Sequence, residues 1–468
     1  MLKRPRCIYL LVLVIIYLTC WCDSGTTSAR PTTNHSFSVV VFSDVHFNPF
    51  YDPSLFRRLV FSDASEWASI FKTSRITAPS AWNTDTNYPL LVLALSSIRQ
   101  NLGASPVIIY TGDLLGHNFS NQFYQYCGSS DVAAMQAFSD KTAAFVMQQV
   151  RSSAGNIPVV FALGNTDSYT GNGPDSTFLS NTAELFYTDF LNGTVNHHAF
   201  LNTFTSAGYY SADLRGTNLR VIGLNTVLFS LGVPADDSAV SAELYWLDST
   251  LASAQAGGKK VWLLMHVPPG ANTVSTATTP SNFDSNGYLI SATMMWVQDY
   301  QARFLGILSK YPGVITLTLA AHTHRDEFRI MSSDDVLDIT PSIAPCFGNG
   351  PAFKVFTFTR ATFTPTDYRS LNYDLAAMPG QFSDYYTFSE AYSMQGPLDS
   401  SLAQLYPALI TNNAQQSIYI GQYNSGNNSV DSGTNTNWNP ITSTNWPVFA
   451  CGIGKMAQLD FIHCVNSY

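Results

Sequence analysis

FSVVVFSDVH, residues 37–46, joins an apolar run of strand-forming residues to an aspartate and a histidine. Val and Phe favour a buried, extended strand, and Asp44 and His46 follow it directly. Alternation along an extended backbone would send both side chains to one side, where both could reach one metal ion. Taken alone, the pair would more simply be interpreted as a buried aspartate and a surface histidine.

Four further polar clusters follow apolar runs in the same way. They are Gly112-Asp113, Gly164-Asn165, His266, and His322 with His324. Each has an ordinary explanation by itself, such as a turn asparagine or a hydrogen-bonded core histidine. Together, however, carboxylate, amide oxygen and imidazole are the ligand types that hold two divalent metals about 3.5 to 4 Å apart for phosphoryl chemistry. The ordered set therefore predicts a site for two metal ions.

Predicted strands and helices alternate along the chain. We predict strands at residues 37–42, 107–111, 159–163, 219–224, 261–265 and 314–320, and helices at 90–102, 132–150, 242–256 and 294–310. This alternation predicts a layered α/β fold with a buried sheet. Ligands in such folds gather at the carboxyl ends of strands, which is where all five clusters fall.

The chain changes character near Ala361. Residues 37–360 form the predicted catalytic domain, and the sequence beyond them is rich in Asn, Ser, Tyr and Gly. We predict that residues 361–468 form a C-terminal extension packed on the catalytic domain, with a flexible low-complexity loop at residues 424–439.

The amino-acid composition indicates the environment of the protein and argues against one class of partner. Only 12% of the 468 residues are charged, below the roughly 25% of a typical soluble protein. Ser, Thr, Asn and Tyr must therefore supply much of the polar surface, which suits a secreted glycoprotein. The formal charge of −9 argues against a nucleic-acid partner, because that partner requires a basic face.

The N-terminus has the pattern of a secretory signal. Lys3, Arg4 and Arg6 precede an apolar run at residues 8–21 and a polar stretch at 23–33. The run is shorter than the about 20 residues of a comfortable membrane span. We therefore predict a signal peptide at residues 1–22 and a secreted or lysosomal protein without a stable span; an uncleaved anchor is the alternative.

The glycosylation sequons and the cysteines are consistent with a protein that is located in a lumen or secreted. Candidate glycosylation sites are Asn34, Asn192 and Asn427; no glycan is expected at Asn118, which directly follows the candidate catalytic residue His117. Three cysteines lie in or beside the predicted signal, and the other four allow three pairings. Cys451 and Cys464 flank a short terminal segment and are predicted to form one bridge. Cys127 and Cys346 form either a second bridge or unpaired buried thiols.

The ordered motifs resemble those of the calcineurin-like metallophosphoesterases. They are Ser43-Asp44-Val45-His46, Gly112-Asp113, Gly164-Asn165-Thr166-Asp167, His266, and Ala321-His322-Thr323-His324. More narrowly, the chain resembles the acid sphingomyelinase-like phosphodiesterases. This likeness rests on His117 four positions after Asp113, on His266-Val267-Pro268-Pro269-Gly270, and on Gly348-Asn349-Gly350-Pro351-Ala352-Phe353. It extends from about Val39 to Phe358.

The resemblance implies a layered β-sandwich flanked by helices, with two metal ions at its edge. Asp44, His46, Asp113 and His324 would hold one ion, and Asp113, Asn165, His266 and His322 the other. Zinc is favoured by the imidazoles, although manganese or iron would also fit. The implied reaction is attack of a metal-bridging hydroxide on a phosphodiester. His117 would contact the phosphate or protonate the leaving oxygen; otherwise it is an exposed loop histidine.

Three features depart from the family pattern. Thr166 occupies the position of a usual histidine, so it can donate a hydrogen bond to phosphate but cannot act as an effective general acid. That role then rests on His117, unless His197 or His198 replaces it from another loop. Ala321 replaces a glycine, which requires a local backbone without positive φ. No cysteine-rich saposin-like segment precedes Asp44. Soluble diesters or nucleotides are therefore expected as substrates more than membrane sphingomyelin.

We therefore expect a monomeric, binuclear-metal phosphodiesterase that acts on small phosphodiesters or phospholipid headgroups. Sphingomyelin-like, choline-phosphate and nucleotide substrates are all compatible with the motifs. Loops at residues 82–89 and 167–175 are expected to contact the substrate. The alternatives are a vacuolar-type endopolyphosphatase, whose family can also lack the histidine at position 166, and a catalytically weak metal-containing binding protein.

Overall fold

The computed structural model describes residues 35–468 except 174, 235, 333–334, 378 and 427–439. The predicted signal peptide and the sequons at Asn34 and Asn427 lie outside these residues, as does most of the predicted flexible loop. Among the described helices, none has the length and apolar character needed to cross a membrane.

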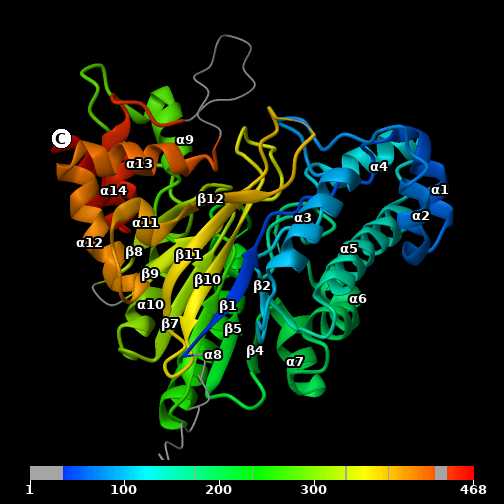
Figure 1. Cartoon of the computed structure of the whole chain (residues 1–468), viewed down its shortest axis with the longest axis horizontal. Coiled ribbons are helices and arrows are strands. Elements are labelled where there is room, and N and C mark those ends of the chain that lie inside the picture. The colour runs from blue at the N-terminus through cyan, green and yellow to red at the C-terminus, as the bar shows by residue number, and fades with distance from the viewer. Residues whose placement is uncertain (1–34, 174, 235, 333–334, 378, 427–439) are drawn as a thin grey trace, which may run out of the picture. The chain divides into compact units, whose positions relative to one another are not determined.

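Two six-stranded mixed sheets form the centre of the fold (Figure 1), in the orders β12-β11-β10-β1-β2-β3 and β4-β5-β6-β7-β9-β8. The first contains β1 (Ser36–Phe42), β2 (Ile108–Tyr110), β3 (Val159–Phe161), β10 (Ala352–Thr359), β11 (Pro365–Asn372) and β12 (Ser383–Thr387). The second contains β4 (Tyr210–Asp213), β5 (Leu219–Gly223), β6 (Lys260–Leu264), β7 (Ile315–Ala320), β8 (Glu327–Ile330) and β9 (Val336–Ile339). The predicted α/β class and all six predicted strands are confirmed.

Each sheet combines a set of parallel strands with antiparallel neighbours, which are β10, β11 and β12 in the first sheet and the edge strands β4 and β8 in the second. β1 pairs in parallel with β2, and β2 with β3; β5, β6, β7 and β9 are likewise parallel neighbours. Val39, Val40 and Val41 of β1 are fully buried, as expected for a strand covered on both faces. The sheets pack on each other, with the rings of Trp262 and Phe358 4.5 Å apart.

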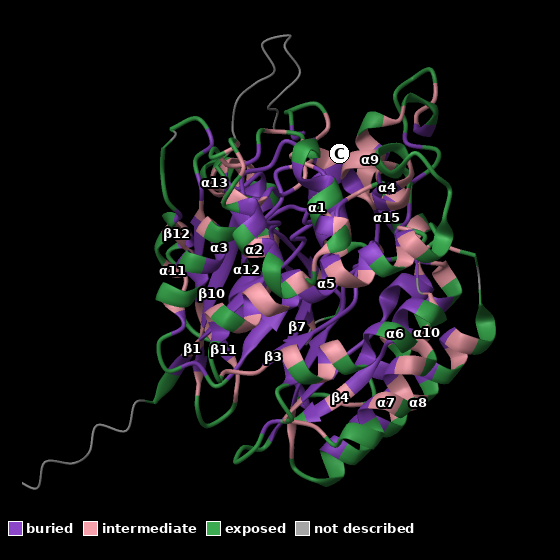
Figure 2. Cartoon of the chain, turned by 90° about the vertical axis from the view of Figure 1, so that its right-hand side faces the viewer, coloured by how far each residue is buried: buried purple, intermediate pink, exposed green. Residues whose placement is uncertain are grey.

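Helices cover the sheets and keep one face in solvent. Figure 2 shows β3 and β7 buried throughout, whereas α6 and α7 retain exposed residues. The helices of the catalytic region are α1 (Phe56–Phe61), α2 (Trp67–Phe71), α3 (Tyr88–Asn101), α4 (Phe119–Cys127), α5 (Val132–Ala154), α6 (Ser176–Leu185), α7 (His197–Ala207), α8 (Asp237–Ala256), α9 (Thr273–Thr278) and α10 (Gln298–Leu308). The four predicted helices correspond to α3, α5, α8 and α10. The last begins four residues later than predicted, because Met294 and Trp296 pair as β-bridges with Ala271 and Ser230.

The chain beyond residue 360 completes the first sheet before it forms helices. β11 and β12 extend that sheet, and they precede α11 (Phe388–Tyr392), α12 (Leu398–Thr411), α13 (Asn413–Tyr423), α14 (Trp446–Gly454) and α15 (Gln458–Asn466). Cys451 and Cys464 form the disulfide expected from the sequence and join α14 to α15. Cys127 and Cys346 are both free, so the second bridge is not formed.

Candidate metal centre

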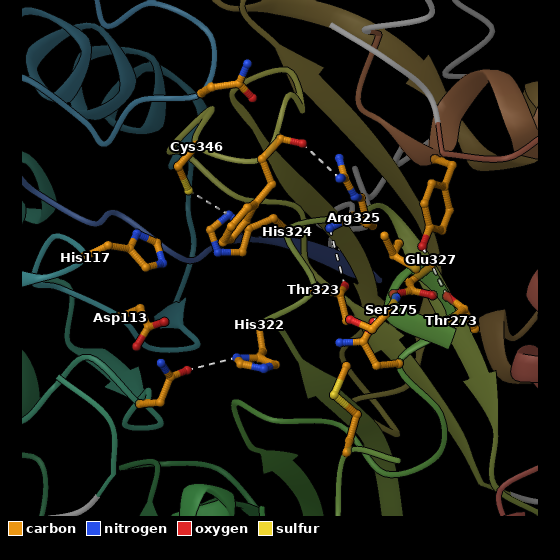
Figure 3. Close-up of a pocket in the computed structure, with 17 residues that line it drawn as sticks. Asp113, His117, Thr273, Ser275, His322, Thr323, His324, Arg325, Glu327 and Cys346 are labelled. Atoms are coloured by element: carbon orange, nitrogen blue, oxygen red, sulfur yellow. Dashed lines mark hydrogen bonds between the residues drawn. The ribbon is translucent and has the colours of Figure 1, made fainter. Parts of the chain in front are cut away.

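Loops from both sheets meet at the carboxyl ends of the parallel strands. Asp44 and His46 follow β1, Asp113 follows β2 and Asn165 follows β3; His266 follows β6, and His322 and His324 follow β7. All seven predicted ligands come together there. Figure 3 shows Asp113, His322 and His324 around one cavity, with His117 beside them.

The first group consists of Asp44, His46, Asp113 and His324. The Nε2 atom of His46 lies 3.3 Å from Asp113 Oδ2 and 3.2 Å from His324 Nε2. His324 Nε2 lies 3.2 Å from Asp44 Oδ1. Two imidazoles and two carboxylates therefore present donor atoms to one small volume, as a metal ion requires.

The second group shares Asp113 with the first. Asp113 Oδ2 lies 3.1 Å from His266 Nε2, and the side-chain oxygen of Asn165 lies 2.9 Å from His322 Nδ1. His266, His322 and Asp113 offer ligand atoms within 4.8 Å of one another. The division into two groups with a common carboxylate is the arrangement that the resemblance implies.

Five of the ligand residues do not have the extended backbone conformation that side-chain alternation requires. Positive φ angles occur at Asp44 (49°), His46 (41°), Asp113 (68°), His322 (72°) and His324 (62°). Non-glycine residues enter this left-handed region at a cost and only where the surroundings hold them. The prediction that Asp44 and His46 converge by alternation along an extended strand is therefore wrong, although this pair does converge on the site, as do His322 and His324. Ala321 is not among the positive-φ residues, which explains why the usual glycine is dispensable there.

Two glycines are required by close contacts. A Cβ atom at Gly112, whose φ is 108°, would lie 2.6 Å from the Gly164 nitrogen and 2.7 Å from His266 Nδ1. A Cβ atom at Gly164 would overlap the carboxylate of Asp113. Larger residues at either position would push the ligand loops apart.

Hydrogen bonds behind the ligands fix their orientation. His46 Nδ1 donates to the Leu115 carbonyl at 3.1 Å and His266 Nδ1 to the Thr111 carbonyl at 2.7 Å, so Nε2 of each ring is the nitrogen left to bind metal. Asp167 accepts from the backbone nitrogens of Asp113 and Gly164 at 3.0 and 2.8 Å. Burial and the nearby Asp113 raise the pKa of Asp167 to about 6.

Unsatisfied buried atoms show that the cluster fits cations. Neither carboxylate oxygen of Asp44 nor Nε2 of His266 has a hydrogen-bond partner among the described residues, and such orphans are costly in a protein interior. Burial opposes ionisation of Asp113, yet His266 and His46 hold its pKa below the usual range. Burial and the neighbouring His266 lower the pKa of His322 to about 3. Ionised carboxylates and a neutral imidazole are the forms that bind metal. Burial opposes protonation of His46 and His266, but Asp113 and Asp44 raise the pKa of each to about 9, so these two rings would release a proton when a cation binds.

His117 lies at the edge of the ligand cluster. Its ring stacks on that of His46, with centroids 4.0 Å apart. Asp85 accepts two hydrogen bonds from this residue, one from ring Nδ1 and one from the backbone nitrogen, each at 2.7 Å. Asp85 belongs to none of the sequence motifs, and its only signal in the sequence is its place in the predicted substrate loop 82–89.

Thr166 does not reach the cavity with its side chain. It is 3% exposed, its hydroxyl has no partner among the described residues, and its backbone nitrogen donates to Asp113 Oδ1 at 2.8 Å. His197 and His198 lie on α7, where the exposed His197 pairs with Glu184 at 2.9 Å. Neither replaces the missing histidine at position 166.

The fold, the ligand set and a cavity of about 490 Å³, lined by four of the ligands, define a metal-dependent phosphoester hydrolase. The model of the calcineurin-like phosphoesterase family matches residues 37–326, more than half of the chain. The chain therefore belongs to the calcineurin-like phosphoesterase family. This membership and the two ligand groups support divalent metal ions as cofactors.

Similar proteins include several named phosphodiesterases. Sphingomyelinase phosphodiesterase C of Dictyostelium discoideum is 25% identical over 317 residues, which cover 61% of this chain and 62% of that protein. Cyclic GMP-AMP phosphodiesterase SMPDL3A of Rattus norvegicus is 23% identical over 406 residues, 81% of this chain and 82% of that protein. Among solved structures, a dimetal phosphatase from Danio rerio superposes with a TM-score of 0.40 at 12% identity, covering 74% of this chain and 98% of that one.

Proposed function

We propose that the protein is a phosphodiesterase that hydrolyses small phosphodiesters at two zinc ions. The observation that carries this proposal is the convergence of seven donor residues with buried, unpartnered atoms of Asp44 and His266. Several imidazoles among the donors favour zinc over magnesium. The similar proteins named as phosphodiesterases support a diester rather than a monoester as substrate.

Each metal ion would have its own group of ligands, with Asp113 common to both groups. Asp44, His46, Asp113 and His324 would hold one ion, and Asp113, Asn165, His266 and His322 the other. Such ions, when bound, polarise phosphoryl oxygens and supply a water nucleophile near neutral pH. Hydrogen bonds from Nδ1 of His46 and His266 to backbone carbonyls hold these rings before substrate arrives, so little reorganisation is needed at the moment of reaction.

His117 is the proposed general acid. Because its Nδ1 is bound to Asp85, Nε2 is the ring nitrogen that is left to deliver a proton to the departing oxygen. The adjacent carboxylate accepts from Nδ1 and holds the ring in place. His117 lines the same cavity as the metal ligands, which places the acid within reach of a bound ester.

We further propose that the protein works in an oxidising, luminal or extracellular compartment. The signal-like N-terminus and the Cys451–Cys464 disulfide support this location. Asn192 is exposed and accessible to a glycan. A monomer that acts on a soluble substrate or on a lipid headgroup fits these properties.

The test uses purified protein loaded with Zn²⁺ and activated aryl phosphates. We expect cleavage of bis(p-nitrophenyl) phosphate, abolished in His322→Ala and unchanged in Arg99→Met, which alters an exposed residue of α3. If the loaded protein cleaves no aryl diester and Thr166→His restores cleavage, the binding-protein alternative holds instead. Shortening of polyphosphate chains without diester cleavage would identify an endopolyphosphatase.

A further inference from the structure

The catalytic cavity continues past the metal ligands to a second wall. This wall, called the Arg325 wall below, consists of Thr273, Ser275, Arg325, Glu327 and Tyr423. Arg325 directly follows His324 in the chain, so the wall begins one residue from the metal centre. Figure 3 shows Arg325, Thr273, Ser275 and Glu327 on the side of the cavity opposite His117 and Asp113.

Arg325 is a buried cation that lacks a carboxylate partner. It is 3% exposed, and none of the described acidic residues lies within ion-pair distance of it. Its Nη1 donates to the side-chain oxygen of Asn424, and its Nη2 donates to the Phe347 carbonyl at 2.9 Å. Its Nε has no partner among the described residues. Arginine is seldom buried without an ion-pair partner, and this guanidinium is held in place with an unused donor and no carboxylate in contact.

Glu327 is ion-paired with a second arginine. Its Oε2 accepts from Arg329 Nη1 at 2.7 Å, and both side chains are almost fully buried. That pair is neutral as a unit, and the remaining formal charge of the Arg325 wall is positive. The hydroxyls of Thr273 and Tyr423, 3.5 Å apart, add donors to the same surface.

We propose that Arg325 determines specificity by binding a second anionic group of the substrate, next to the phosphorus that is attacked. This inference rests on the proposed function, because it assumes that the scissile phosphate occupies the metal centre. A guanidinium with hydroxyl neighbours recognises phosphate or carboxylate oxygens. A trimethylammonium headgroup would instead meet a like charge in a site of low dielectric. The substrate class is therefore a phosphodiester that carries a second phosphate or carboxylate.

Three esters of p-nitrophenyl phosphate test the proposal on the zinc-loaded, full-length protein. They share one leaving group and differ in the second alcohol, which is ethanol, choline or 2-phosphoethanol. We expect kcat/KM to rank the phosphoethyl ester first and the choline ester last. In Arg325→Met the ratio of phosphoethyl to choline ester should fall about 10- to 100-fold, the loss of one charge-assisted hydrogen bond, with Arg325→Lys in between and Arg99→Met equal to wild type.

The possible outcomes separate the two proposals. A wild-type protein that prefers the choline ester, or an Arg325→Met variant with an unaltered ratio, overturns the role of Arg325 while the phosphodiesterase assignment stands. A wild-type protein that cleaves none of the three esters overturns the assignment itself. The ranking in the wild type needs no variant, so poor folding of Arg325→Met would not remove the test.

Discussion

Replacing Asp85 with Asn should impair protonation of the leaving group. Asp85 accepts one hydrogen bond from the His117 ring and one from its backbone, each at 2.7 Å, and its side chain is only 9% exposed. Asn can still accept from the backbone nitrogen, but its neutral amide cannot replace the charge-assisted hydrogen bond that the carboxylate accepts from the ring. A hydrogen bond to a charged group contributes about 1.5–3 kcal/mol, which corresponds to a loss of about 10- to 100-fold in kcat.

The size of the loss should depend on the leaving group. In a series of methyl aryl phosphates, p-nitrophenolate departs without a proton, whereas unsubstituted phenol needs one. Asp85→Asn should therefore lower kcat for the phenyl ester by the full amount and hardly alter kcat for the p-nitrophenyl ester. The matched control is Asp131→Asn, because Asp131 only caps α5 by accepting from the Ala134 nitrogen and Asn caps equally well. An equal loss with every leaving group would refute the assignment of His117 as the acid.

Three further predictions concern stability as well as activity. Thr166→Val should leave kcat/KM unchanged and raise the urea midpoint, because the buried hydroxyl has no partner and its removal relieves a cost of about 1–3 kcal/mol; loss of activity would show that the hydroxyl contacts phosphate. Replacing Cys451 and Cys464 together by Ala opens a bridge that spans 13 residues, and should cost about 3 kcal/mol of unfolding free energy in urea; an oxidised wild type no more stable than the variant would contradict this. Glu243 is fully buried, and burial raises its pKa from 4.5 to about 8. Its carboxyl group thus takes up a proton on folding, and wild-type stability should fall as pH rises from 4.5 to 8. Glu243→Gln should abolish this part of the decline, which urea unfolding at several pH values would measure, and identical slopes for both proteins would be evidence against it.

Much of the fold follows from local sequence patterns. Runs such as Val39–Val41 carry their own signal, because buried parallel strands need apolar residues on both faces. The strands beyond β10 carry a weaker sequence signal. β11 and β12 contain Thr, Asp, Arg, Ser and Tyr, and only the pairing of β11 with β10 and of β12 with β11 places them in the first sheet.

The sequence predicts the set of metal ligands, but it does not predict the backbone conformation at their positions. The residue types and their order along the chain identified Asp44, His46, Asp113 and the other ligands, because only a few side-chain types can bind a metal ion. Alternation failed at Asp44 and His46, since tertiary hydrogen bonds from their nitrogens to the carbonyls of Gly112 and Asp113 hold both in the left-handed region. Asp85 carries no motif, and its pairing with a histidine 32 residues away depends on how two loops meet.

Metal stoichiometry is the most direct test of the two-ion centre. The zinc content of wild-type protein, purified after zinc loading and removal of excess metal, should be two equivalents per chain. Because Asp113 belongs to both ligand groups, Asp113→Ala should bind far less than two, and the surface variant Arg99→Met should keep both. A wild type that binds one zinc or none, or an Asp113→Ala variant that retains two, would contradict the account.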